Sequence, residues 1–213
     1  MSPMPSATSD APSSLSPTVS ETGLGLRELK KLRTRRAIRE AAHHLIDERG
    51  YDNTTIEQIA ASAEVSPSTV FRYFPSKEHI VLTDDYATSS IEFLRARPAD
   101  EAPLVALRAA MTAMVRALSE ELGEEYRWRR KLVREVAPVR ALMRENQDKM
   151  VAAASAVLAE RTGRPETDLE LRVLVGAVTG SLHQVLWGDH DQETTLPEMI
   201  ERALAVLERG LTL

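Results

Sequence analysis

The stretch Thr54–Lys77 constrains the fold of this chain more than any other part of the sequence. It reads TTIEQIAASAEVSPSTVFRYFPSK. Thr54 followed by Glu57 has the spacing of a capping box, so we predict that a helix begins there. The apolar residues behind it recur at helical spacing, and they are Ile56, Ile59 and Ala60.

A second helix is expected after a tight break at 63–65. Ser66 and Pro67 are typical of an N-cap and a first-turn proline, Pro75 predicts the end of this helix, and Ser76 caps the next one. Its predicted apolar face consists of Val70, Phe71 and Phe74. Two short helices joined by a short turn form a helix-turn-helix, whose second helix lies in the major groove of DNA.

The order and spacing of these pieces resemble a known family. A long helix ending in RGYDNTTIEQIAASAEVSPSTVFRYFPSKEHI is similar to the DNA-binding domain of the TetR family of bacterial transcription regulators, from about Thr34 to Val81. A helical bundle that used this stretch only for packing would explain its apolar residues, but not the polar groups around its second helix. The resemblance implies that double-stranded operator DNA contacts residues in and around this motif, for which the candidates are Arg35, Thr54, Thr55, Ser66, Ser68, Thr69, Arg72, Tyr73 and Lys77.

Charge is unevenly distributed along the 213 residues. The net charge is −5, which argues against a protein that coats nucleic acid generally. Residues 26–79 hold 10 Lys and Arg against 8 Asp and Glu, whereas residues 80–213 hold 17 against 22. A mildly basic segment on an acidic remainder fits a local phosphate-contacting surface.

Other classes of protein are excluded or disfavoured by composition. The chain has no cysteine, so disulfides, thiol chemistry and cysteine-based zinc sites are excluded. No apolar run has the length of a membrane span, and the N-terminus does not resemble a secretory signal, so we expect a cytoplasmic protein without a membrane partner.

Helical periodicity continues through the rest of the chain, without strand-like alternation. Residues 1–25 are rich in Ser, Pro and Thr and are expected to be disordered. Further helices are predicted at 26–49, 76–95, 102–120, 124–136, 139–161, 168–188 and 195–210. The expected fold is all-α with about nine helices, and the resemblance implies a DNA-binding domain at 26–80 and a ligand-binding and dimerisation domain at 81–213.

The resemblance implies a homodimer in which the last two long helices of each subunit pair. Gly176 and Gly180, four residues apart, would leave a flat strip where another helix can approach, although close packing within the subunit is the alternative. The residues expected at the interface are Leu169, Val173, Gly176, Gly180, Leu204 and Leu207.

The second domain is expected to hold a small-molecule effector. The segment from Tyr126 to Met150 looks like a branch of the family with acyl-CoA-like ligands, which includes the mycofactocin-system regulator. Methionines can line an adaptable apolar channel and arginines attract phosphates; alternatively, the methionines fill the core and the arginines pair with nearby glutamates. The candidate ligand residues are Met111, Met114, Arg127, Trp128, Arg130, Met143, His183 and Trp187.

No cofactor or metal is expected. The sequence Gly188-Asp189-His190-Asp191 is better explained as a helix end with a solvated loop than as a metal site, because nothing else is placed to complete the coordination. The leading hypothesis is a ligand-responsive regulator, a repressor that binds a palindromic operator as a homodimer. An all-α enzyme or DNA-independent sensor is the rival, although no phosphate-binding loop or nucleophile elbow is present. A nonspecific architectural DNA binder is the third possibility.

Overall fold

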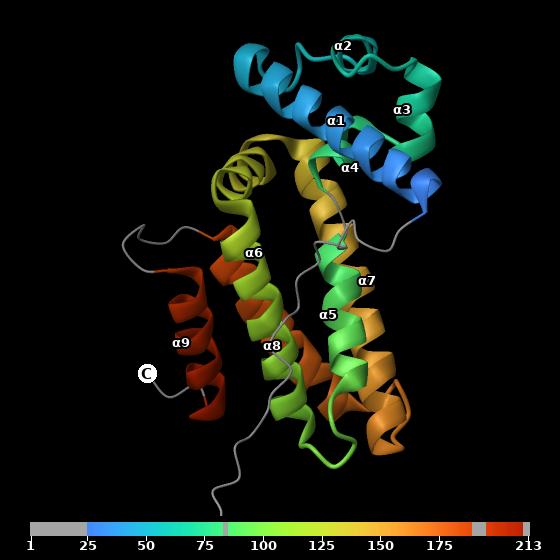
Figure 1. Cartoon of the computed structure of the whole chain (residues 1–213). Helices are drawn as coiled ribbons and strands as arrows, with labels where there is room; N and C mark the ends of the chain where they lie inside the picture. The colour runs from blue at the N-terminus through green and yellow to red at the C-terminus, as the bar shows by residue number, and fades with distance from the viewer. Residues whose placement is uncertain (1–24, 83–84, 189–194, 211–213) are drawn as a thin grey trace, which may run out of the picture.

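The computed structural model describes residues 25–82, 85–188 and 195–210. These residues form helices and no strand, which confirms the all-α prediction (Figure 1). The helices of the described ranges are α1 (Leu26–Arg49), α2 (Ile56–Ser62), α3 (Pro67–Tyr73), α4 (Lys77–Val81), α5 (Asp85–Ala96), α6 (Pro103–Glu135), α7 (Ala137–Thr162), α8 (Leu169–Trp187) and α9 (Leu196–Glu208). The predicted disordered segment lies outside the described residues, except for Gly25.

Helices α1 to α4 form a head at one end of the molecule (Figure 1). Helix α1 ends at Gly50, which has a φ of 82°, a left-handed value that favours glycine. The head is held together by an apolar cluster in which α1, α2, α3 and α4 each bury residues. Its fully or almost fully buried members include Ile38, Ala42, Ile59, Val70, Phe74 and Val81.

The capping box predicted at Thr54 lies one residue further along. Thr55 is the N-cap of α2, where its side chain accepts from the Gln58 backbone N–H and its own N–H donates to the Gln58 side chain. Thr54 is only 1% exposed, and its hydroxyl group donates to the carbonyl oxygens of Leu45 and Gly50. Thr54 therefore ties the α1–α2 connection to α1 instead of capping α2.

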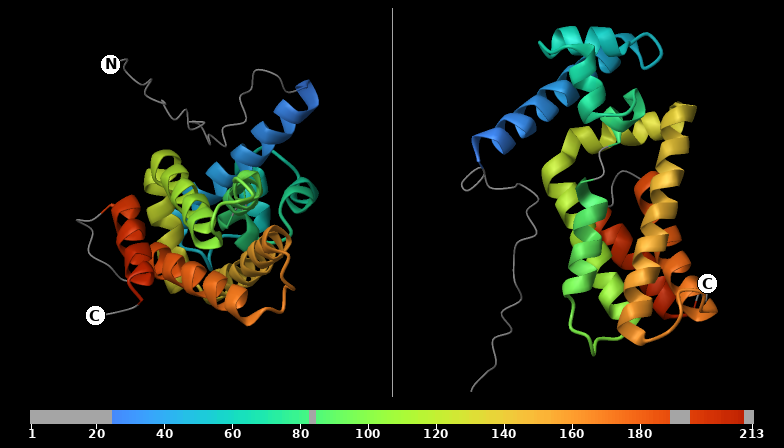
Figure 2. Two further views of the ribbon diagram at one scale, coloured as in Figure 1. Left: turned by 90° about the horizontal axis from the view of Figure 1, so that it is seen from below. Right: turned by 90° about the vertical axis from the view of Figure 1, so that its right-hand side faces the viewer.

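Helices α5 to α9 form an elongated body below the head (Figures 1 and 2). The predicted helices at 102–120 and 124–136 are wrong, because 103–135 is one helix, α6, which turns under the head at its far end (Figure 2). The single helix predicted at 76–95 is also wrong. This segment contains two helices. The first, α4, ends before Leu82, whose φ and ψ of −102° and 88° are not helical, and α5 follows.

The head and the body share apolar packing. Leu132 and Val133 near the end of α6, and Val139 and Leu142 in α7, belong to the same buried cluster as the head residues. Helix α4 packs against both α1 and α7, so the predicted boundary after residue 80 falls inside a helix that bridges the two parts.

Candidate nucleic-acid interface and effector site

The N-terminus of α3 is shaped by one serine. Ser66 accepts a 3.2 Å hydrogen bond from the backbone N–H of Thr69, and its hydroxyl oxygen lies 2.9 Å from those of Ser68 and Thr69. Pro67 occupies the first turn, where its missing N–H costs nothing. The predicted start of this helix is thus confirmed, and three hydroxyl groups gather at its outer end.

One side of α3 anchors the helix and the other faces solvent. Val70 is buried in the head core, whereas Ser68, Phe71 and Arg72 are exposed. Phe71 was expected on the apolar face, but 53% of it is exposed, because its position places it beside Ser68 and Arg72. An aromatic ring on this polar surface is a feature that the sequence interpretation missed.

The Arg72 side chain lies along the same surface. Its guanidinium group donates a 3.4 Å hydrogen bond to the Thr69 hydroxyl oxygen and lies 5.6 Å from the centre of the Tyr73 ring. Tyr73 itself is half-buried. Helix α3 therefore presents hydroxyl, aromatic and guanidinium groups together, which are the groups that read base edges and phosphates.

Lys77 is engaged within the head. Its ammonium group donates to the carbonyl oxygens of Tyr51, at 2.6 Å, and Thr54, at 2.8 Å, and lies 3.9 Å from the centre of the Tyr51 ring. Burial lowers the pKa of Lys77. The side chain thus fixes the loop between α1 and α2, a role that its position in the motif did not predict.

The other predicted DNA-contacting residues differ in exposure. Thr55 and Ser66 are exposed at helix starts. Arg35 is half-buried, with its guanidinium carbon 5.0 Å from the centre of the Phe74 ring. Thr54 is buried, so its side chain offers no surface to DNA, and this part of the prediction is wrong.

Two contacts join the head to the body through α1 and α6. The Glu125 carboxylate on α6 accepts from Arg39 on α1, and from Arg129 at 2.6 Å. The His43 and Trp128 rings lie 4.4 Å apart between the same two helices. Burial alone would raise the pKa of Glu125, but Arg129 and Arg39 hold it below its ordinary value.

A small cleft lies where α6, α7 and α8 meet, close to the head. Its volume is about 270 Å³, and its lining residues are Val133, Arg134, Arg140, Met143, Arg144, His183 and Trp187. Met143, His183 and Trp187 were expected to bind an effector, and Arg134 belongs to the run of arginines that starts at Arg127. Arg140 and Arg144 were missed because they lie on the next helix.

The remaining predicted effector residues lie elsewhere. Met111 and Met114 are buried in the core of the body, whereas Trp128 packs at the head. Arg130 donates to the Gly188 carbonyl oxygen, and Arg127 is exposed. These residues and Met143 therefore do not line one tunnel in this structure.

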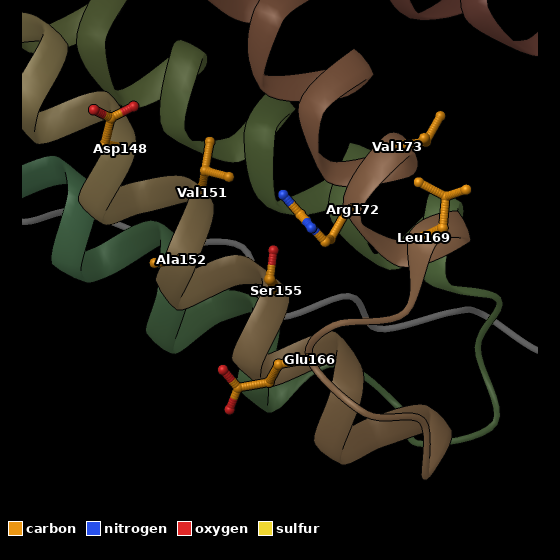
Figure 3. A pocket seen from close by; sticks show the side chains of 8 residues that line it. All are labelled: Asp148, Val151, Ala152, Ser155, Glu166, Leu169, Arg172 and Val173. Carbon is orange, nitrogen blue, oxygen red and sulfur yellow. The ribbon is translucent and has the colours of Figure 1, made fainter.

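A wider groove of about 540 Å³ separates α7 from the start of α8 (Figure 3). Leu169 and Val173 at its edge are 72% and 60% exposed, and Arg172 extends from α8 between the two helices (Figure 3). A Cβ atom built on Gly176 or Gly180 would meet no atom within 4 Å, so close packing within the subunit does not explain these glycines.

The α9 residues expected at the interface are less accessible than those of α8. Leu204 is 1% exposed inside the subunit's own core, so it has almost no apolar area left for a partner, and its assignment is wrong. Leu207 is half-buried and packs against the same core.

The described part of the chain holds neither a cluster of metal ligands nor a membrane-spanning helix. In the ranges that the structure describes, no three His, Asp or Glu side chains are grouped as metal ligands. The loop at Asp189-His190-Asp191 lies outside those ranges. None of the described helices combines the length and apolar character that a membrane crossing requires.

Both parts of the chain match models of known protein families. The family model described as bacterial regulatory proteins of the tetR family matches residues 38–83. The model described as the MftR C-terminal domain matches residues 101–212, which is more than half of the chain.

Individual relatives show similarity in sequence and fold. The HTH-type transcriptional regulator TcmR of Streptomyces glaucescens is 42% identical over 114 residues, 53% of this chain and 49% of that protein, so the chain spans about half of that relative. Thermus thermophilus FadR, a TetR family repressor solved with lauroyl-CoA, has a TM-score of 0.55 and 24% identity, with coverage of 84% and 95%. A regulator from Syntrophomonas wolfei has a TM-score of 0.59 and 23% identity, with coverage of 86% and 98%. At 24% and 23% identity, these two solved structures show a shared fold alone.

Proposed function

Because this chain belongs to the TetR family of DNA-binding transcription regulators, which are not enzymes, we propose that it is a ligand-responsive repressor. The proposal has four parts: a DNA-reading head at 26–80, a body at 81–213, a homodimer, and an effector that releases DNA. The observation that carries it is the division of α3 into a buried side and an exposed side of hydroxyl, aromatic and guanidinium groups.

The exposed side of α3 reads base edges in the major groove. Ser68, Phe71 and Arg72 lie on it, and Ser66 fixes the first turn of the helix. In a helix-turn-helix, residues near the start of the second helix contact bases. Arg72 suits a guanine or a phosphate, and the Phe71 ring suits the methyl group of a thymine.

Two identical heads would read a palindromic operator. In a two-fold dimer, equivalent heads meet half-sites roughly 34–36 Å apart, or a multiple of that distance. The exposed face of α8, with Leu169, Val173, Gly176 and Gly180, supports dimerisation there. Gly176 and Gly180 leave room for a second α8 to approach. Since operator DNA is chromosomal, we place the protein in the cytoplasm.

The effector is a small hydrophobic or acyl-CoA-like molecule. The match to the MftR C-terminal domain and the lauroyl-CoA bound by Thermus FadR support this class. An effector releases DNA only if it binds the DNA-free arrangement more tightly than the DNA-bound one. The contacts of Glu125 and Trp128 with the head provide a route by which the body can alter the position of α1.

Retention of a labelled operator fragment tests the proposal. Dodecanoate, its methyl ester and dodecanoyl-CoA are titrated into the complex of full-length protein and DNA from upstream of its own gene. Release by the coenzyme A thioester at the lowest concentration supports the acyl-CoA class. Equal release by all three, or by none, removes that class and leaves only an unspecified pocket.

A further inference from the structure

The cleft between α6, α7 and α8 is lined by both cationic and apolar residues. Three of its seven lining residues are arginines, one is His183, and none of these seven carries a carboxylate. Arg134 lies at the end of α6, Arg140 and Arg144 lie near the start of α7, and His183 lies near the end of α8. Helices α6 and α7 thus bring three guanidinium groups to one place, and α8 adds the imidazole of His183.

One of these arginines is held in position. The Arg140 guanidinium group donates a 2.6 Å hydrogen bond to the backbone carbonyl oxygen of Arg134, which fixes it at the junction of α6 and α7. Guanidinium groups match the geometry of phosphates and carboxylates, with which they form two parallel hydrogen bonds. Burial, and then the Arg144 charge, lower the pKa of His183, consistent with a positive local potential.

The remaining lining residues of the cleft are apolar. Val133 is buried, and Met143 and Trp187 are half-buried. At about 270 Å³ the cleft lies below the roughly 300–1,000 Å³ of most small-molecule sites, so it fits a head group with a short apolar part, not a long chain.

We propose that this cleft binds the phosphate or carboxylate group of a small organic anion, whose apolar part contacts Met143 and Trp187. Arg144 and Arg140 contact the anion. Trp187 packs against both the head cluster and the body cluster, so the ligand lies where the two parts meet. A role in releasing DNA rests on the proposed function, whereas binding itself does not.

Fluorescence of Trp187 tests the binding. The chain has two tryptophans, so the Trp128→Phe variant of the full chain reports from the cleft alone. The probes are hexyl phosphate, hexanoate, hexanol and inorganic phosphate. We expect hexyl phosphate and hexanoate to change the fluorescence at lower concentrations than hexanol or inorganic phosphate. Equal affinity for hexanol would overturn the proposal.

Charge-matched substitutions locate the site. Arg144→Gln in the Trp128→Phe background should weaken hexyl phosphate binding by about tenfold or more, because it removes a charge-assisted contact. Arg95→Gln, an exposed arginine on α5, removes the same charge elsewhere and should change nothing. Equal weakening by both substitutions, or by neither, would contradict the assignment.

Operator binding distinguishes the proposed anion site from a direct contact of the arginines with DNA. It also tests the effector role separately from anion binding. If Arg144→Gln lowers the salt dependence of DNA binding and leaves hexyl phosphate binding unchanged, the arginines contact DNA and the proposal is wrong. If hexyl phosphate binds through Arg144 without affecting retention of operator DNA, the anion site stands and the proposed effector role fails.

Discussion

The ammonium group of Lys77 lies 2.8 Å from the carbonyl oxygen of Thr54, across 23 residues of sequence. This hydrogen bond, with the one to Tyr51, fastens the start of α4 to the loop that precedes α2. The side chain that was expected to contact DNA therefore holds the helix-turn-helix together in this structure.

Replacing Lys77 should act first on stability. Lys77→Ala removes two charge-assisted hydrogen bonds, and we expect the free energy of unfolding to fall by about 1.5–3 kcal/mol. Chemical denaturation measures this loss, with Lys131→Ala on the exposed side of α6 as control. Below the melting transition, the salt dependence of DNA binding should stay near that of the wild type. A slope lower by about one unit would instead show a direct phosphate contact.

Phe71 should contribute to base recognition without stabilising the fold. We expect Phe71→Ala to weaken operator binding by about tenfold, because it removes the apolar contact with a thymine methyl group. Because 53% of Phe71 is exposed, the melting temperature should hardly change. Replacing operator thymines with deoxyuridine removes their methyl groups. This replacement should weaken binding of the wild type but not of Phe71→Ala, and an equal loss in both would exclude the methyl contact.

Gly180→Leu should separate the subunits and leave each subunit folded. The structure leaves open space around Gly180 within the subunit, and leucine favours helix over glycine by roughly 1 kcal/mol. Sedimentation should show a monomer with an unchanged helical circular dichroism spectrum. Ala96→Leu, which adds a side chain to an exposed position on α5, should remain dimeric. A Gly180→Leu dimer would place the interface elsewhere.

The contact of Glu125 with Arg39 and Arg129 should make stability depend on pH in the acidic range. Glu125→Gln removes the carboxylate charge that Arg129 and Arg39 share, so we expect a loss of about 2 kcal/mol at neutral pH. The pKa of Glu125 is lowered in the folded chain, so its charge contributes above the unfolded pKa and is lost as pH falls through the folded pKa.

The difference in melting temperature between wild type and Glu125→Gln should therefore shrink below about pH 4.5. Glu160→Gln on α7, which is exposed, serves as control. A difference that stays constant from neutral to acidic pH would mean that the Glu125 charge does not stabilise the fold.

Local signals predicted local structure well. Ser66 and Pro67 marked the start of α3. The helices predicted at 26–49 and 139–161 end within one residue of α1 and α7, whose C-caps are Gly50 and Gly163, the latter with a φ of 67°. The helix predicted from residue 195 begins there, because Thr195 forms a capping box with Glu198. These signals lie within a few residues of the feature that they determine, so the sequence alone contains them.

Features set by tertiary packing were not predictable in the same way. Thr54 and Thr55 both have a Glu or Gln three residues later, and only the burial of Thr54 against α1 decides between them. The helix α6 continues through Gly123, although glycine costs about 1 kcal/mol in a helix. The cationic cleft joins arginines of α6 and α7 with His183 of α8, and no single stretch of sequence contains that grouping.

The central claim is that the exposed side of α3 recognises one operator sequence. The most direct measurement is a footprint of the full-length chain on DNA from upstream of its own gene, with a large excess of competitor DNA. We predict two protected half-sites related by a two-fold axis, and loss of protection in Arg72→Ala at unchanged melting temperature. Absence of protection at low salt, or protection that the competitor removes completely, would contradict the claim.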